Sequence, residues 1–254
     1  MNDTICCVPV SSLRAEPSHR SEITSQQVFG EQCVILERAK DNWAKVRCKY
    51  DSYEGWCQEY HLQPLDSNIS SSGMLTREWS NLVFYKGEPM QVPFGSQIPG
   101  LVNGVANWAD ATIGYDGELA DPAKQSFTED EIKHIAKLFL NTSYLWGGKS
   151  IYGIDCSGFC QTVFKYFNIP LMRDAYQQAT QGEVVGFLQE AKCGDLAFFD
   201  NEEGRITHVG ILLNDHRIIH SSAKVRIDPI DNMGIINHEN RERTHKLRII
   251  KRYI

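Results

Sequence analysis

Residues 144–159 read YLWGGKSIYGIDCSGF, and this stretch brings one cysteine, Cys156, to the start of an apolar, helix-prone segment behind a glycine-rich approach. The peptide dipoles and unpaired N–H groups at the N-terminus of a helix stabilise negative charge. A thiol in that position is therefore expected to ionise more readily than a free cysteine. Cys156 is the candidate nucleophile of a cysteine hydrolase.

Two histidines downstream are candidate partners for this thiol. His208 lies near the start of the apolar run 207–213, which predicts a strand, and His220 closes a second short apolar run. Amide hydrolysis needs a nucleophile, a proton shuttle and donors for the tetrahedral oxyanion. The first imidazole can shuttle the proton, and the second can fix the tautomer of the first. The backbone N–H of Cys156 and the phenol of Tyr144 are the candidate oxyanion donors.

Residues 123–254 resemble the NlpC/P60 family of bacterial cell-wall peptidases. The resemblance rests on the lead-in Y-x-W-G-G at 144–148, the nucleophile motif DCSG at 155–158, the CGDL motif at 193–196, and H-V-G at 208–210 followed by His220. It implies a reduced papain-like α+β domain. In this domain Cys156 is the nucleophile, His208 is the general base and acid, and His220 is the polar residue that orients His208.

Other residues of these types have simpler expected roles. Cys160, one helical turn after Cys156, is expected to be a small buried hydrophobe. Asp195 is expected to be a turn residue at the start of a strand. The other six histidines fall at no catalytic spacing and are expected to be surface or structural residues: His19, His61, His134, His216, His238 and His245.

The composition limits the classes of function. The chain has 254 residues, 42% hydrophobic and 23% charged, which is enough for one large domain or two or three small ones. Its formal charge of −6 argues against binding to nucleic acid or to an anionic membrane, because both need a basic face. The eight cysteines include no C-x-x-C pair, so no structural zinc and no other cofactor is expected.

The N-terminus predicts the compartment. It lacks the basic and apolar regions of a signal peptide, and no apolar run in the chain is long enough to span a membrane. Because free thiols are tolerated in the cytoplasm, the sequence predicts a cytoplasmic protein, and a monomer is expected. A leader removed before residue 1 would leave the same sequence.

Residues 1–66 are predicted to form a small β-domain, with strands at 33–37 and 43–48 separated by turn signals. The pattern resembles a bacterial SH3 (SH3b) domain, a small barrel that leaves no exposed sheet edge. The resemblance rests on residues 13–17, 30–31, 42–43, 45–46 and 55–56.

Residues 67–122 are rich in Gly, Ser, Asn and Pro around three candidate strands, at 82–85, 89–96 and 107–113. This region resembles a divergent second SH3b-like domain, and an extended insert between domains is the alternative.

The catalytic domain, residues 123–254, is predicted to begin after a turn at residues 121–122. Thr128 and Glu131 form a capping-box pattern that predicts the first helix of this domain.

This order of domains resembles a narrower group, the γ-D-glutamyl-L-diamino-acid endopeptidases of the dipeptidyl-peptidase VI type. The resemblance implies cleavage of the amide between γ-D-glutamate and meso-diaminopimelate or lysine. The implied substrates are short murein peptides whose N-terminal L-alanine carries a free amine. In this group the first SH3b domain walls off one side of the cleft, which excludes longer peptides.

Recognition of a free amine predicts further site residues, because a desolvated ammonium needs a carboxylate partner. By resemblance, Asp155 contacts the amine together with Glu16 and Tyr53. Ser157 and Trp146 are expected to line the cleft, and Asp174, in a substrate loop at residues 173–177, is expected to contact the ligand.

Each of these binding residues has a structural alternative. Asp155 can cap the helix that starts at Cys156, and Asp174 with Gln177 is close to a capping box. Glu16 and Tyr53 can be ordinary loop surface.

Two other functions also remain open at this point. A thiol acyltransferase or a different amidase could use the same catalytic residues, because a Cys, a His and a polar third group do not dictate the acceptor. A non-catalytic wall-peptide-binding module is the other alternative, although the intact Cys156, His208 and His220 argue against it.

Overall fold

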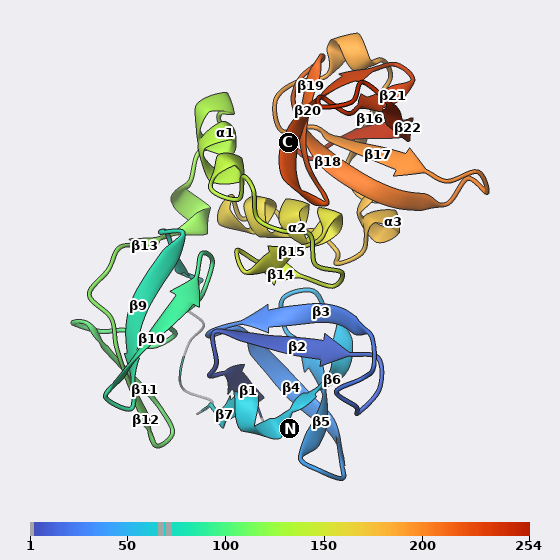
Figure 1. The fold of residues 1–254 in the computed structure, drawn as a ribbon. Helices are drawn as coiled ribbons and strands as arrows, with labels where there is room; N and C mark the ends of the chain where they lie inside the picture. The colour runs from blue at the N-terminus through green and yellow to red at the C-terminus, as the bar shows by residue number, and fades with distance from the viewer. Residues whose placement is uncertain (1–2, 66–68, 70–72) are drawn as a thin grey trace. The chain divides into compact units, whose positions relative to one another are not determined.

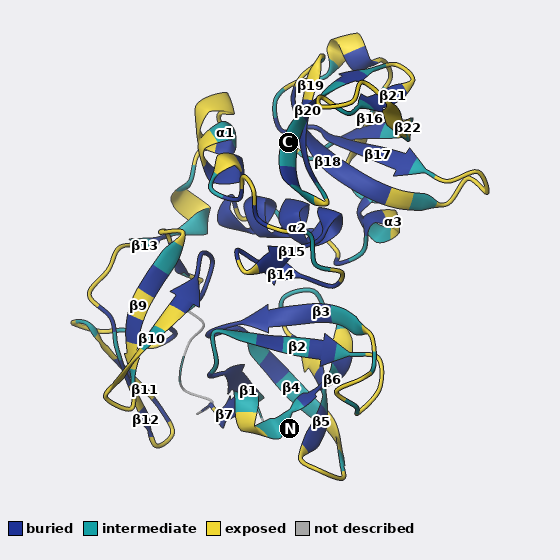
Figure 2. Ribbon diagram, viewed as in Figure 1, coloured by how far each residue is buried: buried dark blue, intermediate teal, exposed yellow. Residues whose placement is uncertain are grey.

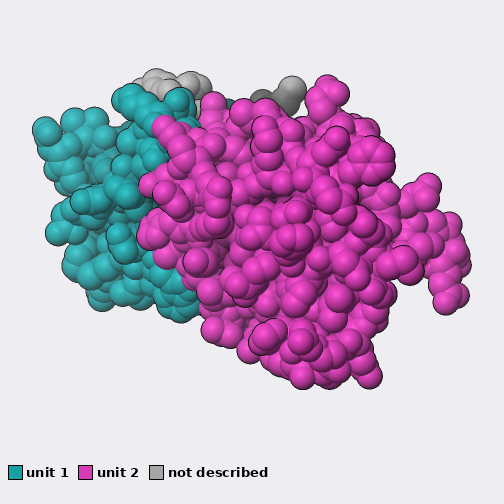
Figure 3. Space-filling view, turned by 90° about the horizontal axis from the view of Figure 1, so that it is seen from above, with its two compact units in different colours: residues 1–125, 146–152 teal, residues 126–145, 153–254 magenta. Residues whose placement is uncertain are grey.

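The computed structural model describes residues 3–65, 69 and 73–254. These form two compact units: Met1–Gln125 with Trp146–Tyr152 (unit 1), and Ser126–Leu145 with Gly153–Ile254 (unit 2) (Figure 1, Figure 3). The predicted boundary at residues 66 and 67 lies outside the described residues. None of the helices in the described ranges has the length and apolar character needed to cross a bilayer.

The first part of unit 1 is an antiparallel sheet in the order β3-β2-β6-β5-β4-β1-β7 (Figure 1). Its elements are β1 (Asp3–Cys6), β2 (Val10–Arg14), β3 (Ile23–Val28), β4 (Gln32–Ala39), β5 (Trp43–Cys48), β6 (Glu54–Gln58), the 3-10 turn η1 (Glu59–His61) and β7 (Leu62–Pro64). The predicted strands at 33–37 and 43–48 are confirmed as β4 and β5. The turn between them places Asp41 and Asn42 at φ 57°, a conformation that these two residue types tolerate better than most.

The second part of unit 1 has its own antiparallel sheet in the order β10-β9-β12-β11. Its strands are β9 (Ser80–Tyr85), β10 (Glu88–Pro93), β11 (Val105–Trp108) and β12 (Ala111–Gly114), with the pair β8 (Leu75–Thr76) and β13 (Leu119–Ala120) beside them and the turn η2 (Pro122–Lys124) after them. The buried Trp108 packs against Phe29, with ring centroids 4.9 Å apart, so the two parts share one apolar core.

One predicted strand in this region is wrong. Residues 107–113 do not form a single strand, because β11 ends at Trp108 and β12 begins at Ala111. Ala109 takes a positive φ of 50° and reverses the chain, which turns the run into a hairpin.

Unit 2 is built on an antiparallel sheet of its own, in the order β16-β22-β17-β18-β19-β20-β21. Because β21 also pairs with β22, the strands from β17 to β22 close into a ring, and β16 adds to its outside edge. The strands are β16 (Glu183–Val185), β17 (Leu196–Asp200), β18 (Ile206–Asn214), β19 (Arg217–Ser222), β20 (Lys224–Asp231), β21 (Gly234–Ile236) and β22 (Arg243–Arg252). Apolar side chains such as Phe199, Leu212 and Ile218 form a buried cluster in this sheet.

The helices of unit 2 are α1 (Glu129–Lys137), α2 (Cys156–Tyr166), α3 (Ala175–Gln178) and the 3-10 turn η3 (Leu188–Glu190). The predicted cap of α1 is confirmed, because Thr128 accepts a hydrogen bond from the Glu131 N–H at 3.4 Å. All residues of α2 are buried, and this helix packs against β18 and β19 (Figure 2). The short strand β15 (Gly153–Ile154) leads directly into α2.

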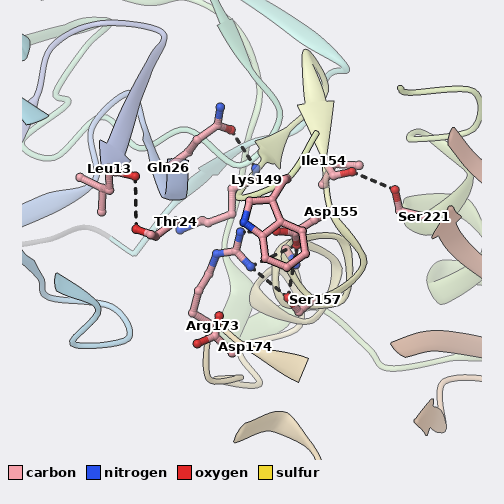
Figure 4. Close-up of polar contacts among 12 residues, drawn as sticks. Leu13, Thr24, Gln26, Lys149, Ile154, Asp155, Ser157, Arg173, Asp174 and Ser221 are labelled. Atoms are coloured by element: carbon pink, nitrogen blue, oxygen red, sulfur yellow. Dashed lines mark hydrogen bonds and ion pairs between the residues drawn. The ribbon is translucent and has the colours of Figure 1, made fainter. Parts of the chain in front are cut away.

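The segment Trp146–Tyr152, which includes β14 (Lys149–Ser150), belongs to unit 1 although unit 2 supplies the chain on both sides of it. The Lys149 ammonium lies 3.2 Å from a carboxylate oxygen of Glu31, and both side chains are at most 5% exposed. The Lys149 backbone N–H donates to Gln26 at 2.8 Å (Figure 4). This segment is therefore held in unit 1 by a buried ion pair and a buried hydrogen bond.

Replacing Lys149 with Met should leave the Glu31 carboxylate buried without its cation. Breaking one side of a buried pair typically costs ~3–5 kcal/mol, and chemical denaturation should show a loss of this size in the free energy of unfolding. Arg38→Met is the matched control, because the pair Arg38–Glu59 is exposed and should be worth less than ~1 kcal/mol. Equal losses in the two variants would contradict the assignment.

Candidate active site

Cys156 is the first residue of α2, and Asp155 caps the helix, so the structural alternative for Asp155 is present in the structure. Asp155 Oδ1 accepts a 2.6 Å hydrogen bond from the Gly158 N–H, which satisfies one of the amides that a helix start leaves unpaired. The chain that enters the helix is anchored to β19, because Ser221 Oγ donates to the Ile154 carbonyl at 2.8 Å (Figure 4). The position of the thiol is therefore fixed by contacts before and after it.

Burial governs the ionisation of this thiol. Desolvation raises the pKa of Cys156 to about 12, and the neighbouring Asp155 carboxylate acts in the same direction. Backbone hydrogen bonds from Val209 and Ser157, and the charge of Arg173, oppose this rise without outweighing it. The prediction that the helix start makes Cys156 ionise readily is therefore wrong, because burial is the larger effect.

The hydrogen bond with Val209 also locates the thiol. Val209 follows His208 in β18, and α2 packs against this strand. The candidate nucleophile thus lies against the strand that carries the candidate base.

The two predicted histidines are joined by a hydrogen bond. His208 Nε2 lies 2.8 Å from His220 Nδ1, and both rings are buried. Gly210 is paired with His220 across β18 and β19, and a Cβ at this glycine would lie 2.7 Å from the His220 Cβ. The glycine of the H-V-G motif therefore leaves room for the Cβ of His220 and for Ile218 on the neighbouring strand. Burial lowers the pKa of both rings, so both are neutral near neutral pH.

The structure adds three residues that no motif in the sequence predicts. His220 Nε2 lies 2.9 Å from Asp228 Oδ2, and Arg226 pairs with the same carboxylate. The His245 ring stacks on the His208 ring, with centroids 4.1 Å apart and 27° between the planes. Asp228 and Arg226 could have been suggested only by the alternation of residues along β20, and His245 is brought in from β22 by closure of the sheet.

A buried ion pair joins Asp155, the residue before Cys156, to Arg173. Arg173 donates to both carboxylate oxygens of Asp155, at 2.6 and 3.1 Å, and to Ser157 Oγ at 3.0 Å (Figure 4). Ser157 Oγ in turn donates to Asp155 at 3.2 Å. The predicted binding residues Asp155 and Ser157 are thus brought together, and the charge of Arg173 balances that of Asp155.

Tyr144 and Asp174 also belong to unit 2. Burial, followed by the charges of Cys156 and Asp155, raises the pKa of the Tyr144 phenol, so this group stays protonated and can donate a hydrogen bond. Asp174 precedes α3, and its backbone N–H donates to the Gln177 side chain at 3.1 Å. The capping alternative for Asp174 is therefore present in the structure.

The remaining predicted binding residues lie in unit 1. Glu16 is exposed in the turn after β2, and Tyr53 packs partly against the core of the first sheet. Trp146 is 61% exposed, and its indole N–H donates to Glu22 at 2.6 Å. Their roles in binding remain predictions.

The high pKa of Cys156 makes a prediction for chemical labelling. Below a pKa of about 12 the thiolate fraction rises about tenfold per pH unit, and the rate of alkylation of Cys156 by iodoacetamide should rise with it across the neutral and alkaline range. Peptide mass mapping measures the rate at each cysteine. Cys193, whose pKa burial raises only to about 11, is the internal reference. An alkylation rate of Cys156 that does not change with pH around neutrality would contradict the raised pKa and would indicate a thiolate–imidazolium pair.

Comparison with known proteins agrees with this geometry. The model of the NlpC/P60 family matches residues 141–244, and that of the bacterial dipeptidyl-peptidase Sh3 domain matches residues 13–62. A crystal structure of an NlpC/P60 family protein from Bacillus cereus has the same fold, with a TM-score of 0.83 over 99% of both chains at 19% identity.

Curated relatives extend the match along the chain. The γ-D-glutamyl-L-lysine dipeptidyl-peptidase of Bacillus subtilis is 29% identical over 215 residues, which cover 78% of this chain and 72% of the relative. A probable endopeptidase of Haemophilus influenzae is 34% identical over 117 residues, which cover 45% of this chain and 70% of the relative. The chain belongs to the NlpC/P60 family of cysteine peptidases and carries an N-terminal bacterial SH3 domain.

Proposed function

We propose that this peptidase hydrolyses the amide between γ-D-glutamate and the diamino acid of short murein peptides that carry a free N-terminal L-alanine, in the recycling of cell-wall peptides. The observation that carries the proposal is the buried Cys156 against β18, the strand that also carries His208, whose ring is hydrogen-bonded to His220. The name of the Bacillus subtilis relative supports the choice of bond. The diamino acid is meso-diaminopimelate or lysine.

The protonation states define the first step. With a neutral thiol and a neutral imidazole, His208 takes the proton of Cys156 while the sulfur attacks the amide carbon. The backbone N–H of Cys156 and the phenol of Tyr144 donate hydrogen bonds to the oxyanion.

The second half of the reaction returns the site to its starting state. His208 gives its proton to the nitrogen of the departing diamino acid, which leaves the γ-D-glutamyl group on Cys156 as a thioester. Water then attacks this carbonyl while His208 takes one of the water protons. The C–S bond breaks, the departing thiolate of Cys156 takes the proton back from His208, and the product is released with an ionised γ-carboxylate.

We assign recognition of the free amine to Asp155, Glu16 and Tyr53. The carboxylate of Asp155 is buried and is held next to Cys156 in the chain by Arg173, Ser157 and the Gly158 N–H, and an ammonium group taken out of water needs a carboxylate partner of this kind. Ser157 and Trp146 are assigned to the walls of the cleft, and Asp174 to the substrate loop.

We also propose the finer organisation of the chain and its compartment. The catalytic domain at 123–254 is a papain-like α+β domain, supported by the packing of α2 against the sheet. Residues 1–66 form the SH3b domain, and residues 67–122 form a second SH3b-like domain, supported by their own antiparallel sheet. All eight cysteines are free, which is typical of the cytoplasm, and we assign the protein there as a monomer that needs no membrane or nucleic acid.

The substrate assignment predicts a selective assay. L-Ala-γ-D-Glu-diaminopimelate should be cleaved between its second and third residues, and the N-acetylated peptide should resist because it has no ammonium group. Mass spectrometry of the products, with an added amine as acceptor, measures both outcomes. Transfer to the added amine would indicate an acyltransferase, binding without cleavage would indicate a binding module, and equal cleavage of both peptides would contradict the amine assignment.

The nucleophile assignment predicts the behaviour of Cys156→Ala. This variant should bind the free-amine peptide with unchanged affinity by calorimetry, because the substituted side chain is small and buried, but its turnover should be undetectable. Cys160→Ala is the matched control, since this thiol is buried one helical turn away and should not be needed for turnover. Hydrolysis retained by the Cys156→Ala protein would remove this thiol from the mechanism.

A further inference from the structure

A line of polar contacts continues from His208 into the interior, beyond the two histidines. His208 Nε2 meets His220 Nδ1 at 2.8 Å, and His220 Nε2 meets Asp228 Oδ2 at 2.9 Å. His220 and Asp228 are only 1% and 2% exposed. A carboxylate therefore ends the line in a place that water hardly reaches.

Asp228 is held as an anion by several donors. Arg226 lies 2.7 Å from Oδ2 and donates to Oδ1 at 3.0 Å, and the backbone N–H of His238 donates to Oδ1 at 2.9 Å. Burial alone would raise the pKa of Asp228, but the hydrogen bonds from His220, Arg226 and His238 outweigh it and hold the pKa below its usual value. Asp228 is therefore ionised across the neutral range.

The charge on Asp228 decides where the protons on the two rings lie. An ionised carboxylate only accepts hydrogen bonds, so His220 Nε2 must carry a hydrogen. Because burial keeps His220 neutral, its Nδ1 has a lone pair and accepts from His208 Nε2. A neutral His208 that carries its hydrogen on Nε2 has an unprotonated Nδ1.

We propose that Asp228 is a positioning residue for this peptidase, one that fixes the tautomers of His220 and His208 so that Nδ1 of His208 is the base that receives the Cys156 proton. The proposal rests on the proposed function and extends it by one residue. The thiol proton moves to His208 Nδ1 only. Asp228 takes no proton, and its charge stabilises the imidazolium of His208 through His220.

Other groups around the line set its charge. Arg226 from β20 offsets the carboxylate, and the exposed Glu239 lies 3.7 Å from Arg226. His245 from β22 stacks on His208, and burial lowers the pKa of His245 to about 4. At neutral pH, the negative charge that contacts the histidine pair is thus Asp228, through its hydrogen bond with His220. Arg226 is the cation paired with Asp228.

Nitrogen NMR tests the tautomers without any substrate. In protein labelled with nitrogen-15 histidine, long-range proton–nitrogen spectra near neutral pH should show both His208 and His220 protonated at Nε2 and unprotonated at Nδ1. His208→Gln and His220→Gln proteins assign the signals. A hydrogen on Nδ1 of either ring in the unmodified protein would overturn the proposal, even if no Asp228 variant folds.

Kinetics tests the consequence for the reaction. In Asp228→Asn the amide can donate to His220 Nε2, which forces the opposite tautomer. Loss of a group that orients a catalytic histidine indirectly should lower kcat by roughly 10- to 100-fold while KM changes little. The acid limb of the pH profile of kcat/KM should also shift. Asp231→Asn is the matched control on the same strand, because its carboxylate pairs with the exposed Arg243.

The alkylation rate of Cys156 separates this proposal from the proposed function. If the unmodified protein fails to cleave murein peptides, the function is wrong, but the NMR tautomers and the iodoacetamide rate still test Asp228. We expect slower alkylation of Cys156 in Asp228→Asn than in Asp231→Asn near neutral pH. Equal rates and an unchanged pH profile in a folded Asp228→Asn protein would overturn the proposal.

Discussion

The proposed chemistry of unit 2 depends on one hydrogen bond, between His208 Nε2 and His220 Nδ1. It forms because β18 and β19 pair in a register that puts Gly210 opposite His220, where the side chain of any larger residue would collide with the Cβ of His220 and with Ile218. The closed ring of strands keeps this register, since a shift of one residue would turn every side chain of the strand to the other face. The geometry of this histidine pair is thus a property of the sheet rather than of a loop.

Burial has opposite effects on the two candidate partners in proton transfer. It raises the pKa of Cys156 and lowers the pKa of His208, so the pair rests as neutral thiol and neutral imidazole. In the proposed mechanism charge develops only when the sulfur attacks, and the proposed oxyanion donors and Asp228 stabilise it. Such a resting state also limits reaction with electrophiles other than the substrate, because the thiolate is the reactive form.

The sequence predicts the parts of the site that depend on local spacing. The start of α2 at Cys156, its cap by Asp155 and the strand with His208 each follow from residues close together in the chain, and the structure contains all three. The sequence could not predict the roles of Asp228 and His245, because strand pairing brings them to the histidines from β20 and β22. The sequence also could not predict the raised pKa of Cys156, because the burial that raises it is set by tertiary packing.

The placement of Trp146–Tyr152 in unit 1 limits how this protein can be recombined in evolution or in the laboratory. A peptidase fragment cut free at the end of the first unit would still carry the Lys149 ammonium, but the Glu31 carboxylate that neutralises it would be left behind. Transplanting the catalytic sequence onto a foreign N-terminal module would meet the same obstacle unless that module supplied an acidic pocket. The two parts of the gene are therefore expected to be inherited as one piece.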